Sequence, residues 1–273
     1  MFDAGQRNAD SATLGHRNLI AYSRALTRWG SRGDLHEADG VLAYAGGSPI
    51  PVVGNGAFRA AETVSPATLI GVADNFFARH RRGYSIKVRD TGQDDDLRQA
   101  CEENGFATFG EPVPEMICEH ALKVPPLPEG VRMQRVGDVA GISDFAAVNA
   151  DAYSTYSMPA DVLGDLFDQP ENVLADPDTT IVVAYRGTQP LAAALTYVSD
   201  GIASLQWVGS INEARRLNLG RAVTVWATNV AFELGAASCT LQASPMGAPL
   251  YTALGYETLY RYRDHVRWTA PRG

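Results

Sequence analysis

The stretch EARRLNLGRAV, from Glu213 to Val223, places arginines and turn-forming residues directly before a helix with one apolar face. The first backbone N–H groups of a helix have no partner within the helix, and the positive end of the helix dipole lies there. Such an N-terminus binds phosphate groups, and nearby arginines add positive charge. The stretch therefore predicts a phosphate-binding turn; the alternative is an ordinary helix start with solvated arginines.

The elements around this turn follow a definite order. The hydrophobic patterns predict a strand at 131–136, helices at about 138–150 and 159–167, and strands at 180–185, 191–198 and 202–208. The helix after the turn carries Val223, Ala227, Val230 and Leu234 on one face and ends at Gly235. A strand at 238–243, a helix ending in ALGY and a strand reaching Trp268 complete this half.

This order resembles the GCN5-related N-acetyltransferase (GNAT) superfamily. The motif of that family is Arg or Gln, two residues, Gly, one residue, and Gly or Ala, which Arg215, Asn218 and Gly220 match with Asn218 as a departure. Asn adopts positive φ more readily than most residues, so the departure is mild. The resemblance implies a mixed α/β fold with a twisted, mostly antiparallel sheet. It also implies acetyl-coenzyme A as acyl donor, with its pyrophosphate held by Arg215, Arg216, Leu217, Asn218, Leu219, Gly220 and Arg221.

The resemblance implies roles for residues on both sides of the turn. Backbone groups of Val208, Gly209 and Ser210 would pair with the pantetheine arm, and Ser244 would help to orient it. The Val208 N–H would also bind the oxyanion. Tyr251, in APLYTALGY, takes the place of the tyrosine that protonates the departing thiolate. For Tyr251 the alternative is a partly buried helix aromatic.

The sequence leaves the general base open. The strand IASLQWV carries Ser204 and Gln206 but no carboxylate, so a water held by Gln206 is one hypothesis for proton transfer. ADAYSTYSMP, with Asp151, Tyr153 and Tyr156, is expected either to line the acceptor site or to be a solvated helix end.

The first half repeats the second in weaker form. At one offset of 150 residues, Gly105 matches Gly255 and Leu69 matches Leu219, and the strand YSIKV lies near the place of SCTLQA. This predicts a tandem duplication with a GNAT-like domain at 1–122, a proline-rich linker at 123–130 and a GNAT domain at 131–273.

The first half lacks the cofactor motif. Cys101 stands where Tyr251 does, and VSPATLI, with Ser65 as predicted N-cap and Pro66 as first helical residue, replaces the arginine-rich turn. We therefore expect no cofactor binding there. LHEAD, from Leu35 to Asp39, is expected to be a loop; the alternative is that it supplies a base across the domain interface.

Composition narrows the choice of partners. The chain has 273 residues and a formal charge of −8, which argues against a nucleic acid partner. With no apolar run of membrane-spanning length and no signal-peptide pattern, a cytoplasmic protein without a membrane partner is expected. The scattered cysteines and histidines predict neither disulfides nor a metal site, and Cys101, Cys118 and Cys239 are expected in the core.

These inferences predict an N-acetyltransferase that moves acetyl from acetyl-coenzyme A to an amine of a small molecule or peptide, by direct transfer in a ternary complex. A non-catalytic acyl-coenzyme A binding module is the alternative, favoured by Asn218 and the missing carboxylate. Transfer of a longer acyl or aminoacyl-like group is a third reading. The resemblance further implies that the last strand pairs with another domain or with a second subunit, which would give a homodimer.

Overall fold

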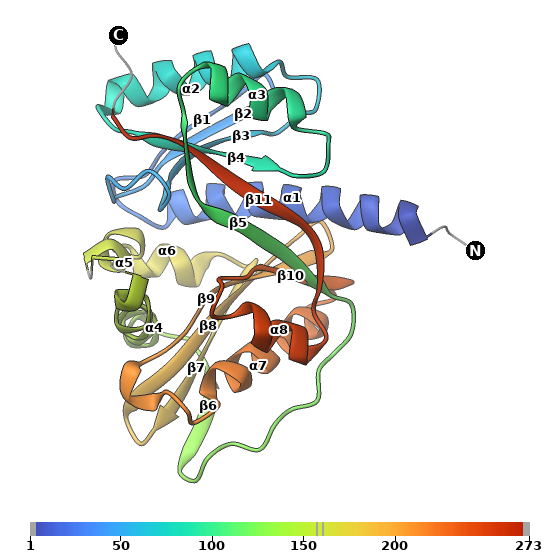
Figure 1. Ribbon diagram of the computed structural model, residues 1–273. Helices are drawn as coiled ribbons and strands as arrows, with labels where there is room; N and C mark the ends of the chain where they lie inside the picture. Colours follow the sequence, from blue (N-terminus) through green and yellow to red (C-terminus); the bar gives the residue numbers. More distant parts are fainter. Residues whose placement is uncertain (1–3, 157, 160, 270–273) are drawn as a thin grey trace.

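The computed structural model describes residues 4–156, 158–159 and 161–269, which form one continuous sheet of eleven strands covered by helices (Figure 1). The first half contains α1 (Ala4–Arg28), β1 (Asp34–Ala38), β2 (Val41–Ala45), β3 (Asn55–Arg59), α2 (Pro66–His80), β4 (Tyr84–Arg89), α3 (Asp95–Glu103) and β5 (Ala107–Cys118). The second half contains β6 (Val131–Arg135), α4 (Val139–Tyr153), the 3₁₀ turn η1 (Ser154–Tyr156), α5 (Asp161–Leu166), α6 (Pro170–Ala175), β7 (Thr179–Arg186), β8 (Gln189–Ser199), β9 (Ile202–Ser210), the 3₁₀ turn η2 (Asn212–Ala214), α7 (Leu219–Glu233), β10 (Ser238–Gln242), α8 (Ala248–Leu254) and β11 (Glu257–Arg267).

The two halves share the middle of this sheet. The strand order is β1-β2-β3-β4-β11-β5-β10-β9-β8-β7-β6. Thus β5, from the first half, pairs antiparallel with β10 of the second, and β11 pairs antiparallel with β4 of the first; β5 and β11 also pair with each other. In Figure 1 these are the long green and red strands at the centre. Each half therefore completes the sheet of the other, although residues 119–130 between them form no helix or strand.

Two prolines lie within β5, and local contacts explain how the strand accommodates them. Pro112 falls in a register shift against β11, next to Gly110 at φ 61°. Pro114 pairs with Arg261, but the N–H and C=O of Arg261 bond instead to Asp90, at 2.6 and 3.0 Å. The N–H that Pro114 lacks is therefore not needed for this pair.

The predicted duplication is present in the fold. The succession α2–β4–α3–β5 repeats as α7–β10–α8–β11. The turns after α3 and α8 both contain a glycine with positive φ, Gly105 at 73° and Gly255 at 96°. Ser65 caps α2 by accepting a hydrogen bond from the Thr68 N–H at 3.1 Å, as predicted. The mixed α/β fold in tandem form is thus confirmed.

Most of the predicted elements are present, but three details differ from expectation. Helix α6 was not predicted, because it buries only Val173 and so shows no apolar face, whereas α5, equally short, buries three residues. Leu234 is 47% exposed and lies at the end of α7, whereas Val223, Ala227 and Val230 form its buried face. LHEAD forms β1 instead of a loop, because Asp39 and Gly40, both with positive φ, make a two-residue hairpin to β2.

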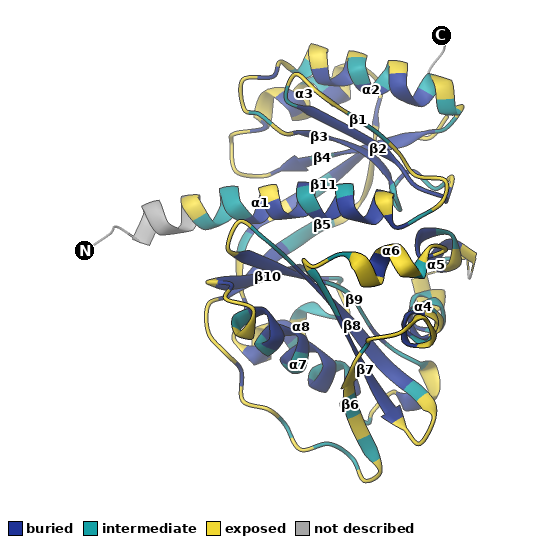
Figure 2. Ribbon diagram, turned by 180° about the vertical axis from the view of Figure 1, so that it is seen from behind, coloured by how far each residue is buried: buried dark blue, intermediate teal, exposed yellow. Residues whose placement is uncertain are grey.

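Helices cover both faces of the sheet, and its strands form the core (Figure 2). On the strands of the second half, α7 and α8 pack against one face. Helices α4 to α6, together with α1 of the first half, pack against the other face. Helix α1 lies across the middle, against strands of both halves. Within the described residues, no helix combines the length and apolar character needed to cross a membrane.

Candidate functional site

The strands β9 and β10 separate at one end. Their parallel pairing runs from Ile202 and Ser238 to Leu205 and Leu241, and β9 then continues to Ser210 without a partner on that side. This leaves an open strand edge with free backbone groups. The predicted gap beside Val208, Gly209 and Ser210 is therefore present.

A β-bulge shapes this edge. Two residues of β9, Trp207 and Val208, lie opposite one residue of β8, and Trp207 has the left-handed φ of 52°. This conformation costs on the order of 1–2 kcal/mol for a non-glycine residue. The Ile211 N–H donates to Leu191 O on β8, so strand alternation turns the N–H groups of Ser210 and Val208 toward the gap.

Contacts from both halves hold the bulge in place. The Trp207 indole N–H donates to the hydroxyl of Tyr22, on α1, at 2.5 Å. The Trp207 ring also packs edge-on against Tyr153 and Phe167. Because Tyr22 is only 4% exposed, this hydrogen bond is shielded from water.

The arginine-rich turn leads directly into α7. Arg216 and Asn218 adopt left-handed φ values of 71° and 57°, so Asn218 has the conformation that the motif glycine would supply. In the described structure, the first hydrogen bond of α7 runs from Ala222 N to Asn218 O, and the three preceding N–H groups, of residues 219–221, have no acceptor. Nor do the turn arginines form an ion pair with any described residue. Unpaired donors and free positive charge therefore meet at one helix end.

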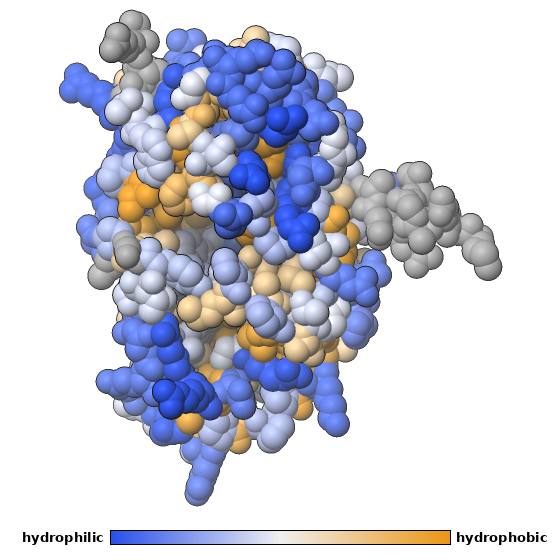
Figure 3. All heavy atoms as spheres, in the orientation of Figure 1, coloured by the Kyte–Doolittle hydropathy of each residue, from blue (hydrophilic) through white to orange (hydrophobic). Residues whose placement is uncertain are grey.

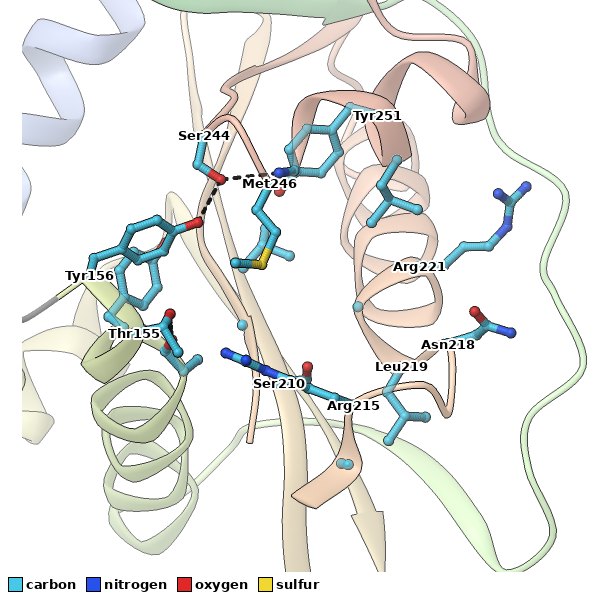
Figure 4. A pocket seen from close by; sticks show the side chains of 18 of the residues that line it. Thr155, Tyr156, Ser210, Arg215, Asn218, Leu219, Arg221, Ser244, Met246 and Tyr251 are labelled. Atoms are coloured by element: carbon cyan, nitrogen blue, oxygen red, sulfur yellow. Dashed lines mark hydrogen bonds between the residues drawn. The ribbon is translucent and has the colours of Figure 1, made fainter. Parts of the chain in front are cut away.

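The gap, the turn and α8 enclose one cavity of about 320 Å³ (Figure 4). The predicted site residues that line it are Val208, Gly209, Ser210, Arg215, Arg216, Asn218, Leu219, Gly220, Arg221, Ser244 and Tyr251. Leu217 does not line it; its side chain packs on the core beside α7. Apolar and neutral side chains gather over β10 and α8 in the surface view (Figure 3).

Tyr251 points into this cavity from α8 (Figure 4). Burial, reinforced by the neighbouring Tyr156, raises the pKa of Tyr251 to about 12, so its hydroxyl keeps its proton at neutral pH. Gly247 makes room for the ring, because a Cβ there would lie 2.7 Å from Tyr251 Cε2. Ser244 accepts from the Gly247 N–H and from the Tyr156 hydroxyl, both at 3.1 Å.

The candidate acceptor residues divide into two groups. Tyr153 and Tyr156 line the cavity. Asp151 does not, because its carboxylate accepts a hydrogen bond from Asn212 N at 2.6 Å and so braces the turn. Glu37, in LHEAD, lies on an edge strand at the far end of the sheet and pairs with Arg24, so it supplies no base here.

The sequence did not predict the other cavity residues, which are Ala152, Thr155, Ala214, Gln242, Met246, Gly247 and Leu250. Gln242 could have been predicted. It lies two residues before Ser244, and side chains two apart in an extended chain project from the same face. Gln206, the hypothetical water holder, is not among the lining residues of this cavity.

The corresponding gap in the first half is filled by charged side chains. There β3 and β4 pair only from Gly56 to Ala57, and Arg59 and Asp94 lie beyond, with 5% and 1% of their surface exposed. Asp94 binds Arg89 at 2.8 Å and lies 3.7 Å from Arg59. Arg59 and Asp94 stand 150 residues before Gly209 and Ser244. This filled gap gives a physical basis for the prediction that the first half binds no cofactor.

The cysteines are free and buried. Among the described residues, no group of three or more His, Cys, Asp or Glu side chains is arranged to hold a metal ion.

No protein-family model matches the sequence, and no curated protein does. Solved structures do match. A GCN5-related N-acetyltransferase from Kribbella flavida is 22% identical over 93% of this chain and 96% of its own, with a TM-score of 0.66. One from Sphaerobacter thermophilus is 15% identical over 85% and 78%, with a TM-score of 0.60. A tandem GNAT protein from the clavulanic acid biosynthesis pathway is 12% identical over 89% and 86%, with a TM-score of 0.61. The chain therefore has the fold of the GCN5-related N-acetyltransferases, in its tandem form.

Proposed function

We propose that the protein is an N-acetyltransferase that moves the acetyl group of acetyl-coenzyme A to an amine of a small molecule or peptide. The observation that carries the proposal is the single cavity lined by an open strand edge, a helix N-terminus with free N–H groups and a buried tyrosine. The tandem fold, found also in GCN5-related N-acetyltransferases, supports it.

In this proposal the turn and the strand edge bind the donor. The free N–H groups of Leu219, Gly220 and Arg221 and the arginines of the turn suit a pyrophosphate. The inward N–H groups of Val208 and Ser210 suit the amide carbonyls of a pantetheine arm, which would lie along β9 like an added strand.

The reaction needs a polarised carbonyl and a protonated leaving group. The amine nitrogen attacks the thioester carbon, and the Val208 N–H stabilises the negative charge on the carbonyl oxygen. As the C–S bond breaks, the Tyr251 hydroxyl donates its proton to the thiolate. The proton that the amine loses replaces the one that Tyr251 gives to the thiolate, so Tyr251 is restored and no net proton is consumed. Direct transfer in a ternary complex fits a cavity in which the described cysteines, all buried in the core, offer no nucleophile.

The rival proposal is a non-catalytic acyl-coenzyme A binding module. The left-handed backbone of Asn218 weakens one argument for it, because Asn218 adopts the geometry of the motif glycine. The absence of a carboxylate among the described cavity residues still favours it. A donor with a longer acyl or aminoacyl-like group would use the same cavity.

Tyr251→Phe separates transfer from binding. The variant should keep acetyl-coenzyme A affinity and slow transfer by roughly 10²- to 10⁴-fold, the usual loss for a missing general acid. Coenzyme A release in the presence of primary amines measures the rate. Tyr256→Phe is the control, because it removes a buried hydroxyl, bonded to Thr228, outside the cavity. An unchanged rate in Tyr251→Phe would remove Tyr251 from the mechanism.

A further inference from the structure

A buried carboxyl group from the first half lies beside this cavity. Glu115, on β5, is 2% exposed and is the cross-strand partner of Gln242 on β10 and of Tyr260 on β11. Because cross-strand partners project from the same face, these three side chains lie side by side. That face is covered by α1, whose Gly15 packs near Thr240 and Tyr260.

Glu115 and Gln242 each keep an unsatisfied atom. Among the described residues, neither Oε2 of Glu115 nor Nε2 of Gln242 has a hydrogen-bond partner, although both atoms are buried. When Glu115 is ionised, its Oε2 only accepts, and the Nε2 of Gln242 only donates, so the two atoms complement each other. An unpaired buried polar group is costly and calls for an explanation.

The surroundings of Glu115 bring the pKa of its carboxyl group close to neutral pH. Burial raises its pKa to about 7, whereas the polar side chains of Thr240 and Gln242 and the cation of Lys87 lower it. Lys87 is itself bound to Asp264 at 3.1 Å.

Three other titratable groups near this carboxyl change protonation well away from neutral pH. On β11, burial raises the pKa values of Tyr260 and Tyr262 well above their usual range. On α1, burial lowers the pKa of His16, which is bonded to Tyr262, to about 4. Glu115 is therefore the group among these whose charge changes near pH 7.

Gln242 connects this carboxyl to the cavity, which it lines beside Ser244. A carboxylate can only accept, so pairing with Glu115 turns the amide NH₂ of Gln242 inward and presents its carbonyl oxygen to the cavity. A protonated Glu115 can donate instead, which allows the opposite orientation of the amide.

We propose that Glu115 is a positioning residue for the acceptor: acting through Gln242, it presents a carbonyl oxygen that accepts a hydrogen bond from the attacking amine. This inference rests on the proposed function and deepens it. It also explains why the second half needs no carboxylate of its own to recognise an N–H donor, since β5 brings one from the first half.

The test compares four proteins: wild type, Glu115→Gln, Gln242→Ala and the double variant. Acceptor kcat/KM is measured from pH 6 to pH 8 with phenethylamine, spermidine and a tripeptide with a free amino terminus. Dividing the kcat/KM of the wild type by that of Glu115→Gln cancels the effect of pH on the ionisation of the amine itself. We expect this ratio to rise roughly two- to tenfold with pH, the worth of one hydrogen bond between neutral groups, and to stay flat in the Gln242→Ala background. Calorimetry should give the same acetyl-coenzyme A affinity in Glu115→Gln as in the wild type, because Glu115 does not line the cavity.

Denaturant unfolding of the same proteins tests the link without turnover. We expect the shifts of the unfolding midpoint to be non-additive, because the two side chains interact. Additive midpoints, or a ratio that is flat with pH in a wild type that transfers acetyl, would overturn the Glu115 proposal and leave the proposed function standing. A wild type that binds acetyl-coenzyme A but acetylates no amine would overturn both the transfer reaction and the acceptor role, and one that binds no acetyl-coenzyme A would overturn the whole account.

Discussion

The buried carboxyl of Glu115 should give the protein a measurable dependence of stability on pH. Its pKa is raised from 4.5 to about 7 by burial. Below pH 4.5 the folded and unfolded chains both hold this proton, so Glu115 adds no pH dependence. Between pH 4.5 and 7 the unfolded chain releases the proton while the folded chain retains it, and the free energy of unfolding falls. Above pH 7 both forms have released it, and the loss is complete.

The size of this loss follows from the shift. At about 1.4 kcal/mol for each pKa unit, a shift of this size corresponds to about 3 kcal/mol. Glu115→Gln keeps the shape but carries no charge, so its stability relative to wild type should rise by about this amount between pH 4.5 and 8.

Urea unfolding of both proteins at several pH values measures the difference in their free energies of unfolding. Taking this difference cancels the contribution of every group that is the same in both proteins, such as His16. A difference that does not change with pH would mean that Glu115 titrates normally, and would refute the reasoning.

Two further variants test how the first half supports the site. Arg59→Ala opens the filled gap of the first half and removes a buried partner of Asp94, so it should lower the free energy of unfolding by about 3 kcal/mol. The control is Arg24→Ala, which breaks an exposed ion pair and should cost below about 1 kcal/mol by chemical unfolding. Equal losses in the two variants would contradict the buried role of Arg59. Tyr22→Phe removes the hydroxyl that holds Trp207 and should lower kcat by about tenfold with little change in KM, whereas Tyr197→Phe, which alters the same aromatic cluster, should leave kcat nearly unchanged; an equal loss in both would mean that Tyr22 acts only on stability.

Local signals predicted much of the second half and of its turn. Short apolar runs separated by turn-forming residues predicted β7 to β10, and the arginine-rich turn located the start of α7. Asn218 was expected to tolerate positive φ, and it does. These features depend on residues near one another in sequence, which is why pattern and spacing were sufficient.

The exchange of the central strands could not be predicted from local signals; only the resemblance implied that the last strand pairs with another domain, as β11 does with β4 and β5. Pairing of β5 with β10 joins residues more than 100 positions apart, and two prolines in β5 argued against a strand. Consequently Glu115 was not considered as part of the site. The bracing of Trp207 by Tyr22 was missed for the same reason, because it depends on where α1 lies against the sheet.

The most direct test of the central claim is calorimetric titration of acetyl-coenzyme A into the wild type, Gly220→Glu and Gly71→Glu, with coenzyme A and ATP as comparison ligands. Gly220→Glu puts bulk and negative charge at the start of α7, while Gly71 lies on α2 with no atom within 4 Å of an added Cβ. We predict binding on the order of micromolar, selective for the coenzyme A compounds, kept in Gly71→Glu and lost in Gly220→Glu. Absence of binding to the wild type, or equal binding of ATP, would contradict the claim that this turn holds a coenzyme A pyrophosphate.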